Sequence, residues 1–155
     1  MGIEIERKFL VADSSWRSQV DKILAYEQGY ISSNSAGTVR VRIEGERARL
    51  NIKSAGLDIQ RMEYEYPIPF ADAREMLDTL CLYGKVSKQR HFIIQDKHTW
   101  ELDEFTGKNS GLLVAEIELS SRDEKFELPD WLGEEVSADP RYLNNNLAKF
   151  PFEDW

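Results

Sequence analysis

Charged and apolar residues alternate with a period of two through most of this chain. The segment TVRVRIE, for example, places Arg40 and Arg42 between valine and isoleucine residues. Successive side chains of a β-strand point to opposite faces, so the pattern predicts strands with one charged and one apolar face. About eight segments rich in β-branched or aromatic residues are expected to be strands: 4–11, 26–32, 38–45, 48–56, 61–69, 86–96, 97–107 and 111–120.

Three other segments are predicted to be helical. Residues 14–24 have apolar side chains at helix-like spacing. Residues 70–84 carry an apolar stripe on which Cys81 is expected to be a buried core residue, and a last helix is expected from about 140 to 148. With 155 residues, the chain is expected to form one domain, 1–155, of the α+β class and mainly β.

The charged faces decide how the sheet closes. One such strand is explained by an antiparallel sheet whose charged face lies in water. Here, however, the faces carry Glu, Asp, Arg or Lys at nearly every site, and the signs separate by strand: EIE, EYE and EIE are acidic, whereas RVR and KQR are basic. We therefore expect an eight-stranded antiparallel closed β-barrel with a charged lumen, its apolar outer face covered by a few helices.

A lumen with both signs of charge suits a small polyanion and a divalent metal. Arginine and lysine on neighbouring strands can hold a chain of phosphates through charge-assisted hydrogen bonds. Paired carboxylates supply the oxygen ligands that Mg²⁺ or Mn²⁺ prefers, together with phosphate oxygens and water. Phosphoryl transfer needs mainly positioning and charge stabilisation, so this set of residues is sufficient in kind for hydrolysis.

Composition argues against other classes of partner. The net charge of −8 opposes general binding to nucleic acid or to anionic membranes. The single cysteine, Cys81, excludes an intramolecular disulfide, no apolar run has membrane-spanning length, and the charged N-terminus is unlike a signal peptide. The expected location is the cytoplasm. The sequence leaves the oligomeric state open, and a homodimer is compatible with it, because homo-oligomers are common and apolar outer faces can exceed what three helices cover.

The opening EIERK resembles the ExExK signature of the CYTH superfamily, the triphosphate tunnel metalloenzymes. The resemblance continues in the same order through QGYI, TVRVR, LNIKS, EYE, KQRHF, WELDEF, AEIEL and the closing EEVSADPRYLNNNLA. It implies an eight-stranded antiparallel tunnel and the metal-dependent hydrolysis of a triphosphate, as in the small, tripolyphosphatase-like bacterial members.

The resemblance also implies roles for individual residues. The expected ligands of Mg²⁺ or Mn²⁺ are Glu4, Glu6, Glu116, Glu118 and Asp103. The expected triphosphate-binding residues are Lys8, Arg40, Arg42, Lys53, Lys88 and Arg90. Lys8 and Tyr30 are expected to activate water, and Glu63 is expected to contribute to catalysis from an acidic tunnel position. The roles of Glu65 and Glu101 stay open between metal binding, water positioning and the orientation of basic residues.

Several other residues are expected to have structural rather than catalytic roles. His91 is expected to point out of the lumen, and His98 to lie on the surface at a turn. Arg49 has the inward phase, whereas Arg47 is expected to be solvated. Trp16 and Trp131 are expected to pack in apolar cores, and the acidic end of the chain is either a free tail or a cover for one tunnel mouth.

The favoured reaction is the hydrolysis of inorganic tripolyphosphate to pyrophosphate and phosphate, because no aromatic or amide pocket for a base or thiamine ring is evident in the sequence. The alternatives are a nucleoside or thiamine triphosphatase, a class IV-type adenylate cyclase and a non-catalytic polyphosphate-binding module. The presence of the carboxylates favours the enzyme over the binding module. A lipocalin-like carrier of apolar ligands is opposed by the charged phase of the strands.

Overall fold

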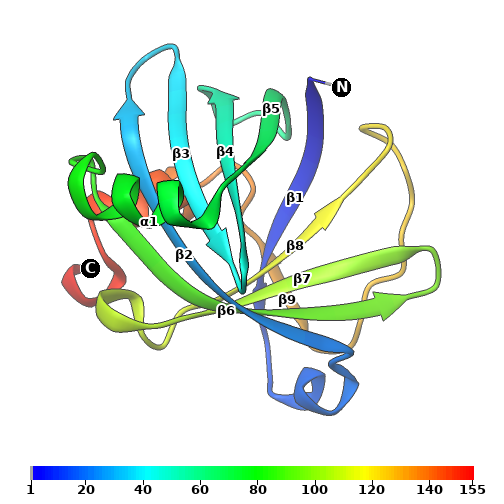
Figure 1. Cartoon of the computed structure of the whole chain (residues 1–155). Coiled ribbons are helices and arrows are strands. Elements are labelled where there is room, and N and C mark those ends of the chain that lie inside the picture. Colours follow the sequence, from blue (N-terminus) through cyan, green and yellow to red (C-terminus); the bar gives the residue numbers. More distant parts are fainter. Residues whose placement is uncertain (1) are drawn as a thin grey trace.

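The computed structural model describes residues 2–155, which form a closed antiparallel barrel (Figure 1). Eight strands make the wall in the order β5-β4-β3-β2-β6-β7-β8-β1, and β5 pairs with β1 to close it. A ninth strand, β9, continues the sheet beside β1. The strands are β1 Ile3–Val11, β2 Lys22–Ser33, β3 Gly37–Glu44, β4 Arg47–Ser54, β5 Gln60–Ile68, β6 Lys85–Gln95, β7 His98–Phe105, β8 Leu113–Glu118 and β9 Leu132–Glu135. The predicted eight-stranded barrel is confirmed, and β9 is an addition.

Short helices decorate the barrel. They are the 3₁₀ helices η1 Ser15–Gln19, η2 Gly107–Asn109, η3 Pro140–Tyr142 and η4 Phe152–Asp154, and the α-helices α1 Phe70–Thr79 and α2 Asn144–Lys149. The helix predicted at 70–84 is confirmed in α1, although it ends before Cys81, which is buried as expected. None of the helices within residues 2–155 is long and apolar enough to cross a membrane.

Two helix predictions were wrong in extent. A helix over 14–24 does not form, because β2 starts at Lys22 and pairs with β6 over eight consecutive residues. The hydrogen bonds of that ladder outweigh the local helical periodicity, and Ile23 of the expected apolar stripe is 53% exposed. The helix expected at 140–148 is divided into η3 and α2 by Leu143, whose backbone is extended (φ −69°, ψ 132°).

The apolar residues lie outside the barrel wall in three clusters. One contains Phe9, Trp16, Trp100, Ile117 and Trp131. A second packs α2 and Tyr142 against β6 and β8, and a third packs α1 against β3 and β4. Burial of these outward faces leaves the alternate side chains of each strand pointing into the lumen. The packing roles predicted for the two tryptophans are confirmed.

The cover of the outer surface is incomplete at β4 and β5. Ile52, Met62, Tyr64 and Tyr66 are 40%, 55%, 45% and 53% exposed on neighbouring strands. The expected cover by helices is therefore confirmed for only part of the barrel. The chain end does not line the lumen: Trp155 packs edge to face on Tyr142, with ring centroids 5.3 Å apart.

Candidate active site

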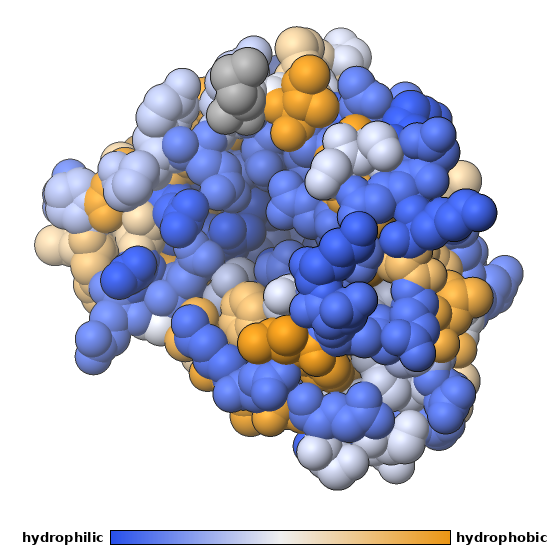
Figure 2. Space-filling view, turned by 90° about the vertical axis from the view of Figure 1, so that its right-hand side faces the viewer, coloured by the Kyte–Doolittle hydropathy of each residue, from blue (hydrophilic) through white to orange (hydrophobic). Residues whose placement is uncertain are grey.

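The lumen is a polar cavity of about 260 Å³. Figure 2 views the molecule from the right-hand side of Figure 1 and shows the hollow surrounded by hydrophilic residues. The residues proposed from the sequence that line it are Glu4, Glu6, Lys8, Tyr30, Arg40, Arg42, Lys53, Glu63, Lys88, Arg90, Glu116 and Glu118. Glu65, Glu101 and Arg49 also line it, whereas Asp103 does not. The strands thus bring together all but one of the residues that the sequence placed in a site.

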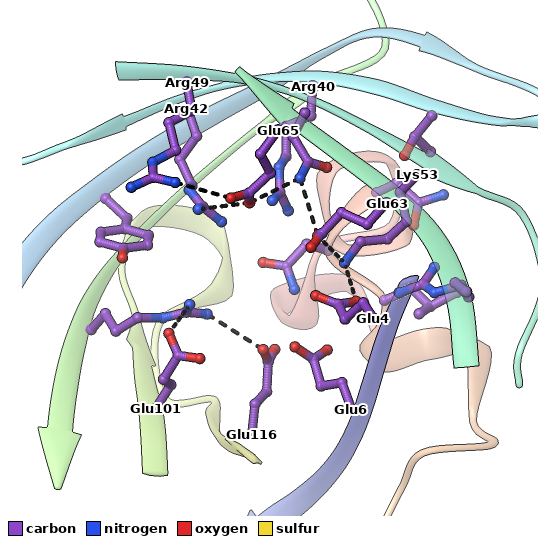
Figure 3. Close-up of a pocket in the computed structure, with 18 of the residues that line it drawn as sticks. Glu4, Glu6, Arg40, Arg42, Arg49, Lys53, Glu63, Glu65, Glu101 and Glu116 are labelled. Atoms are coloured by element: carbon purple, nitrogen blue, oxygen red, sulfur yellow. Dashed lines mark hydrogen bonds and ion pairs between the residues drawn. The ribbon is translucent and has the colours of Figure 1, made fainter. Parts of the chain in front are cut away.

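Cations from β3, β4 and β6 form the basic part of the lining. Arg40, Arg42, Lys88 and Arg90 are all at least nine-tenths buried. Burial lowers the pKa of Lys88 to about 8, although Asp103 opposes the shift. In Figure 3, the labelled arginines lie on one side of the cavity, and Glu6, Glu101 and Glu116 lie across from them. A polyanion in the lumen would therefore meet closely spaced positive charges that are poorly solvated.

Carboxylates from β1, β7 and β8 form the acidic part of the lining. The register places Glu6 opposite Glu118, and Glu116 opposite Glu101. Burial, and then the charges of Glu116 and Glu4, raise the pKa of Glu6 well above its usual value. Partial burial, followed by the charges of Glu4 and Glu101, raises the pKa of Glu118 at the cavity rim to about 7. The charges of Lys53 and Lys8 lower the pKa of Glu6, but they do not offset burial and the neighbouring carboxylates, so positive charge is in deficit at this site.

A bound divalent cation would supply the positive charge that these carboxyl groups need. The donors are hard carboxylate oxygens, as Mg²⁺ and Mn²⁺ prefer. Within residues 2–155, however, no three carboxylate, histidine or cysteine side chains are gathered closely enough to hold a metal by themselves. Glu4 is paired with Lys53 at 2.8 Å, and Glu116 lies 3.5 Å from Lys8. Metal binding here would draw on phosphate oxygens and water as additional ligands.

Asp103 lies behind the lining rather than on it. It is fully buried, and its Oδ1 accepts a hydrogen bond from Arg90 Nε at 2.7 Å. Its Oδ2 lies 2.8 Å from Arg90 Nη2 and 2.7 Å from Lys88 Nζ. With both oxygens occupied by cations, Asp103 is placed to orient Arg90 and Lys88, and the structure does not bring it to the other carboxylates as a metal ligand.

Glu63 and Glu65 also contact basic and amide side chains. Glu63 accepts from Asn51 at 3.1 Å and pairs with Lys53 at 3.4 Å. Glu65 accepts from Asn51 at 3.0 Å and from Arg49 at 3.1 Å. In Figure 3 these contacts run along the basic side of the cavity. Both carboxylates are therefore placed to hold cations and Asn51 in position, which favours the orienting role for Glu65 among those left open.

Lys8 and Tyr30 both reach the lumen, from β1 and β2. Lys8 Nζ lies 3.5 Å from a Glu116 oxygen and 3.4 Å from the carbonyl oxygen of Tyr142. The Tyr30 hydroxyl oxygen accepts a hydrogen bond from Gln28 Nε2 at 3.2 Å and pairs with the Arg40 guanidinium. Both side chains therefore lie among polar partners inside the lumen.

Several lining residues had no role in the interpretation of the sequence. They are Tyr26, Glu44, Asn51, Arg61, Asn144 and Asn145. Tyr26 lies an even number of residues from Tyr30, and Asn51 lies two residues from Lys53. The two-residue alternation could therefore have predicted that both side chains face the lumen. Asn144 had no such signal, because it reaches the cavity from α2, where its Oδ1 accepts from Lys88 Nζ at 2.9 Å.

The residues assigned outside the site are mostly confirmed. Arg47 is exposed, and His91 points outward against Trp16, with ring centroids 4.7 Å apart. His98 was expected on the surface, but it is only 9% exposed. It packs against Phe126, with ring centroids 6.3 Å apart, and its Nε2 lies 2.5 Å from Glu124. The segment after β8 folds back over the start of β7 and covers it.

Comparison with known proteins agrees with this architecture. An inorganic triphosphatase of Acetivibrio thermocellus is 44% identical over 155 residues, which are 100% of this chain and 99% of that protein. An inorganic triphosphatase of Nitrosomonas europaea is 36% identical over 149 residues, 94% of this chain and 96% of that protein. The crystal structure of the inorganic triphosphatase NE1496 superposes with a TM-score of 0.64 at 35% identity, covering 94% of this chain and 93% of that one. The CYTH domain model matches residues 2–149, and this chain belongs to the CYTH domain family.

Proposed function

We propose that this protein hydrolyses inorganic tripolyphosphate to pyrophosphate and phosphate, with Mg²⁺ or Mn²⁺ as cofactor. The observation that carries the proposal is a polar cavity inside a closed barrel, in which a basic lining from β3, β4 and β6 faces carboxylates from β1, β7 and β8. The similarity to two proteins named inorganic triphosphatase, at 44% and 36% identity, supports the same reaction.

The cations hold the substrate. Arg40, Arg42, Lys53, Lys88 and Arg90, with Lys8 from the other side of the lumen, bind the phosphate oxygens through charge-assisted hydrogen bonds. Burial of these groups strengthens each interaction, because water screens them poorly. Asp103, Glu63 and Glu65 keep the cations in position rather than binding metal.

The carboxylates hold the cofactor. Glu6 and Glu118, with Glu4 and Glu116 beside them, supply the oxygen ligands. When bound, the divalent ion neutralises charge on the phosphates and activates water for attack. The raised pKa values of Glu6 and Glu118 fit this role, because a cation would favour their ionised forms.

Lys8 and Tyr30 handle the proton of the attacking water. The water oxygen forms a bond to a terminal phosphorus, the bridging P–O bond breaks, and pyrophosphate leaves with the bonding electrons. The phenolate form of Tyr30 takes up the proton and becomes the neutral phenol, with Gln28 and Arg40 as donors toward its oxygen. Lys8 compensates the negative charge that develops at the reacting phosphate.

The first experiment compares phosphate release from tripolyphosphate, ATP and thiamine triphosphate, each with Mg²⁺, with Mn²⁺ and with chelator. Metal-dependent turnover that is fastest with tripolyphosphate is the expected result. Faster turnover of ATP or thiamine triphosphate would assign an organic triphosphate as substrate, and formation of a cyclic nucleotide would assign a cyclase. Tight binding of tripolyphosphate without turnover of any substrate would contradict the enzyme and favour a binding module.

Location and assembly complete the proposal. A single cysteine and an acidic charge balance fit a cytoplasmic enzyme without nucleic-acid or membrane partners. The sequence leaves the oligomeric state open, and we propose a homodimer through the exposed face of β4 and β5, which light scattering coupled to gel filtration tests directly. Replacement of Tyr64 by Glu at that face should then yield a monomer, whereas a monomeric wild-type protein would contradict the dimer.

A further inference from the structure

Tyr26 lies inside the lumen between three cations. Its side chain lines the cavity and the residue is 5% exposed. The ring centroid is 5.1 Å from Arg42 Cζ, 4.9 Å from Arg90 Cζ and 5.9 Å from Lys88 Nζ. The register explains this position, because Lys88 is the direct β6 partner of Tyr26, while Arg42 and Arg90 are the partners of its neighbours at i+2 and i−2. One ring thus contacts three cations from two strands.

The three cations differ in how closely carboxylate oxygens approach them. Arg90 and Lys88 each have an oxygen of Asp103 at 2.7 Å. Within residues 2–155, the ionic contacts of Arg42 are longer, 3.3 Å to Glu44 and 3.4 Å to Glu65. Burial, followed by the charges of Arg40 and Arg90, lowers the pKa of Arg42. Its Nε is buried without a hydrogen-bond partner among residues 2–155. Arg42 is therefore the cation that gains most from the negative face of an aromatic ring.

The hydroxyl group keeps the ring in this position. It pairs with the carboxylate of Glu44, which in turn lies 3.3 Å from Arg42 and 2.8 Å from Arg49. Burial raises the pKa of Tyr26 to about 12, so the ring is neutral at physiological pH. A neutral ring attracts cations through its quadrupole, and its faces are occupied by them rather than free to stack on a nucleobase.

We infer that Tyr26 is a positioning residue whose ring holds Arg42, Lys88 and Arg90 in the arrangement that binds the phosphate chain. The inference rests on the proposed triphosphate chemistry and adds to it a residue that the strands place among the phosphate-binding cations. An aliphatic side chain of similar size would leave three like charges without the ring, and they would separate or turn toward carboxylates. Substrate affinity should then fall more than the rate of the chemical step.

The test replaces Tyr26 by Phe, by Leu, and by phenylalanines carrying one, two or three fluorine atoms. Fluorine withdraws negative potential from the ring face while its shape changes little, so a structural role alone would not follow the number of fluorines. Binding of inorganic tripolyphosphate is measured by calorimetry in chelator, and kcat and KM are measured with Mg²⁺. Tyr83→Leu is the matched control, because Tyr83 is 46% exposed, lies outside the cavity and contacts one cation, Lys149, at 5.7 Å.

Tyr26→Phe should bind within about threefold of wild type, and affinity should fall stepwise to roughly tenfold weaker at three fluorines. Tyr26→Leu should weaken binding by roughly 10- to 30-fold, with a smaller change in kcat, whereas Tyr83→Leu should match wild type. Equal affinity across the fluorine series would overturn the inference even if Tyr26→Leu fails to fold. Absence of tripolyphosphate binding by the wild-type protein would instead overturn the proposed function, and this inference with it.

Discussion

At the scale of single residues, the site is organised by charged groups that protein partners balance only in part. Glu6 and Glu118 face each other across β1 and β8, and the pKa of each carboxyl group is raised. Lys88 shows the opposite response, because burial lowers its pKa to about 8. Both shifts express the cost of keeping a charged group out of water without a full set of partners. A bound metal and a bound triphosphate would supply those partners.

Replacing Glu118 by Gln tests the carboxylate side. Turnover should fall by at least about 100-fold and need more Mg²⁺, because one oxygen ligand loses its charge. The melting temperature without metal should stay the same or rise, since one repelling charge is removed from the empty lumen. Phosphate release over a Mg²⁺ titration, with thermal unfolding in chelator, measures both effects. Glu46→Gln in the exposed β3–β4 turn is the control, and turnover of Glu118→Gln equal to that of the control would exclude Glu118 as a ligand.

The lowered pKa of Lys88 predicts that substrate binding is coupled to proton uptake. Its pKa in the free protein is about 8, so at pH 8.5 it is mostly neutral, whereas a bound triphosphate favours the charged form. Binding at pH 8.5 should therefore take up at most about three-quarters of a proton at Lys88, and the uptake at this group should vanish near pH 6.5. Calorimetry in two buffers of different ionisation enthalpy measures it. If Lys88→Met takes up as many protons as wild type at pH 8.5, another group is responsible.

At the scale of the elements, the lumen depends on strand phase and on one helix that reaches it from outside. The two-residue alternation predicted correctly that almost every site residue faces the lumen, because neighbouring residues of a strand must face opposite sides of the wall. Asp103 lies on the same inward face of its strand, yet it lies behind Arg90 and Lys88. The alternation therefore predicts which way a side chain points, but not whether it reaches the cavity. The helix α2 adds Asn144, whose Oδ1 accepts from Gln28 Nε2 at 3.2 Å and from Lys88.

Replacing Asn144 by Leu tests that element. The substitution removes an acceptor from two buried donors, Gln28 and Lys88, and should lower the free energy of unfolding by roughly 1–3 kcal/mol. Urea unfolding followed by tryptophan fluorescence measures the change. Asn145→Leu provides a control in the same helix, because Asn145 makes a single long contact, 3.4 Å to Ser33 Oγ. Equal destabilisation of both variants would show that helix propensity, rather than the lumen contact, dominates.

At the scale of the whole molecule, the barrel inverts the usual placement of side chains. Its apolar clusters lie outside the wall, beneath α1, α2 and the segment around Trp131, and its charged residues lie inside. A fold of this kind gathers like charges in its centre, where they repel one another. A ligand that brings both metal and phosphate charge into the lumen should therefore bind the folded state alone and stabilise it.

That stabilisation is measurable as a shift in thermal unfolding. Tripolyphosphate in chelator, where no hydrolysis is expected, at 100 times Kd should add about 2.7 kcal/mol to the free energy of unfolding. For a chain of this size, that corresponds to a rise of roughly 5–10 °C in the melting temperature. Orthophosphate at the same concentration should produce a smaller rise, because it contacts fewer of the cations. An equal shift with both anions would indicate general anion binding instead of a triphosphate site.

Much of this protein follows from its sequence alone. The two-residue alternation determines which side chains share a face, and the separation of signs by strand indicates a lumen for phosphate and metal. Only the tertiary structure decided where the period stops and how deep each residue lies. The strand pairing from Lys22 overrode a local helical pattern, and β9 joined β1 from a segment with little pattern of its own. The surroundings of Tyr26, Asp103 and Asn144 depend on residues far away in the chain, and no local period encodes contacts of that kind.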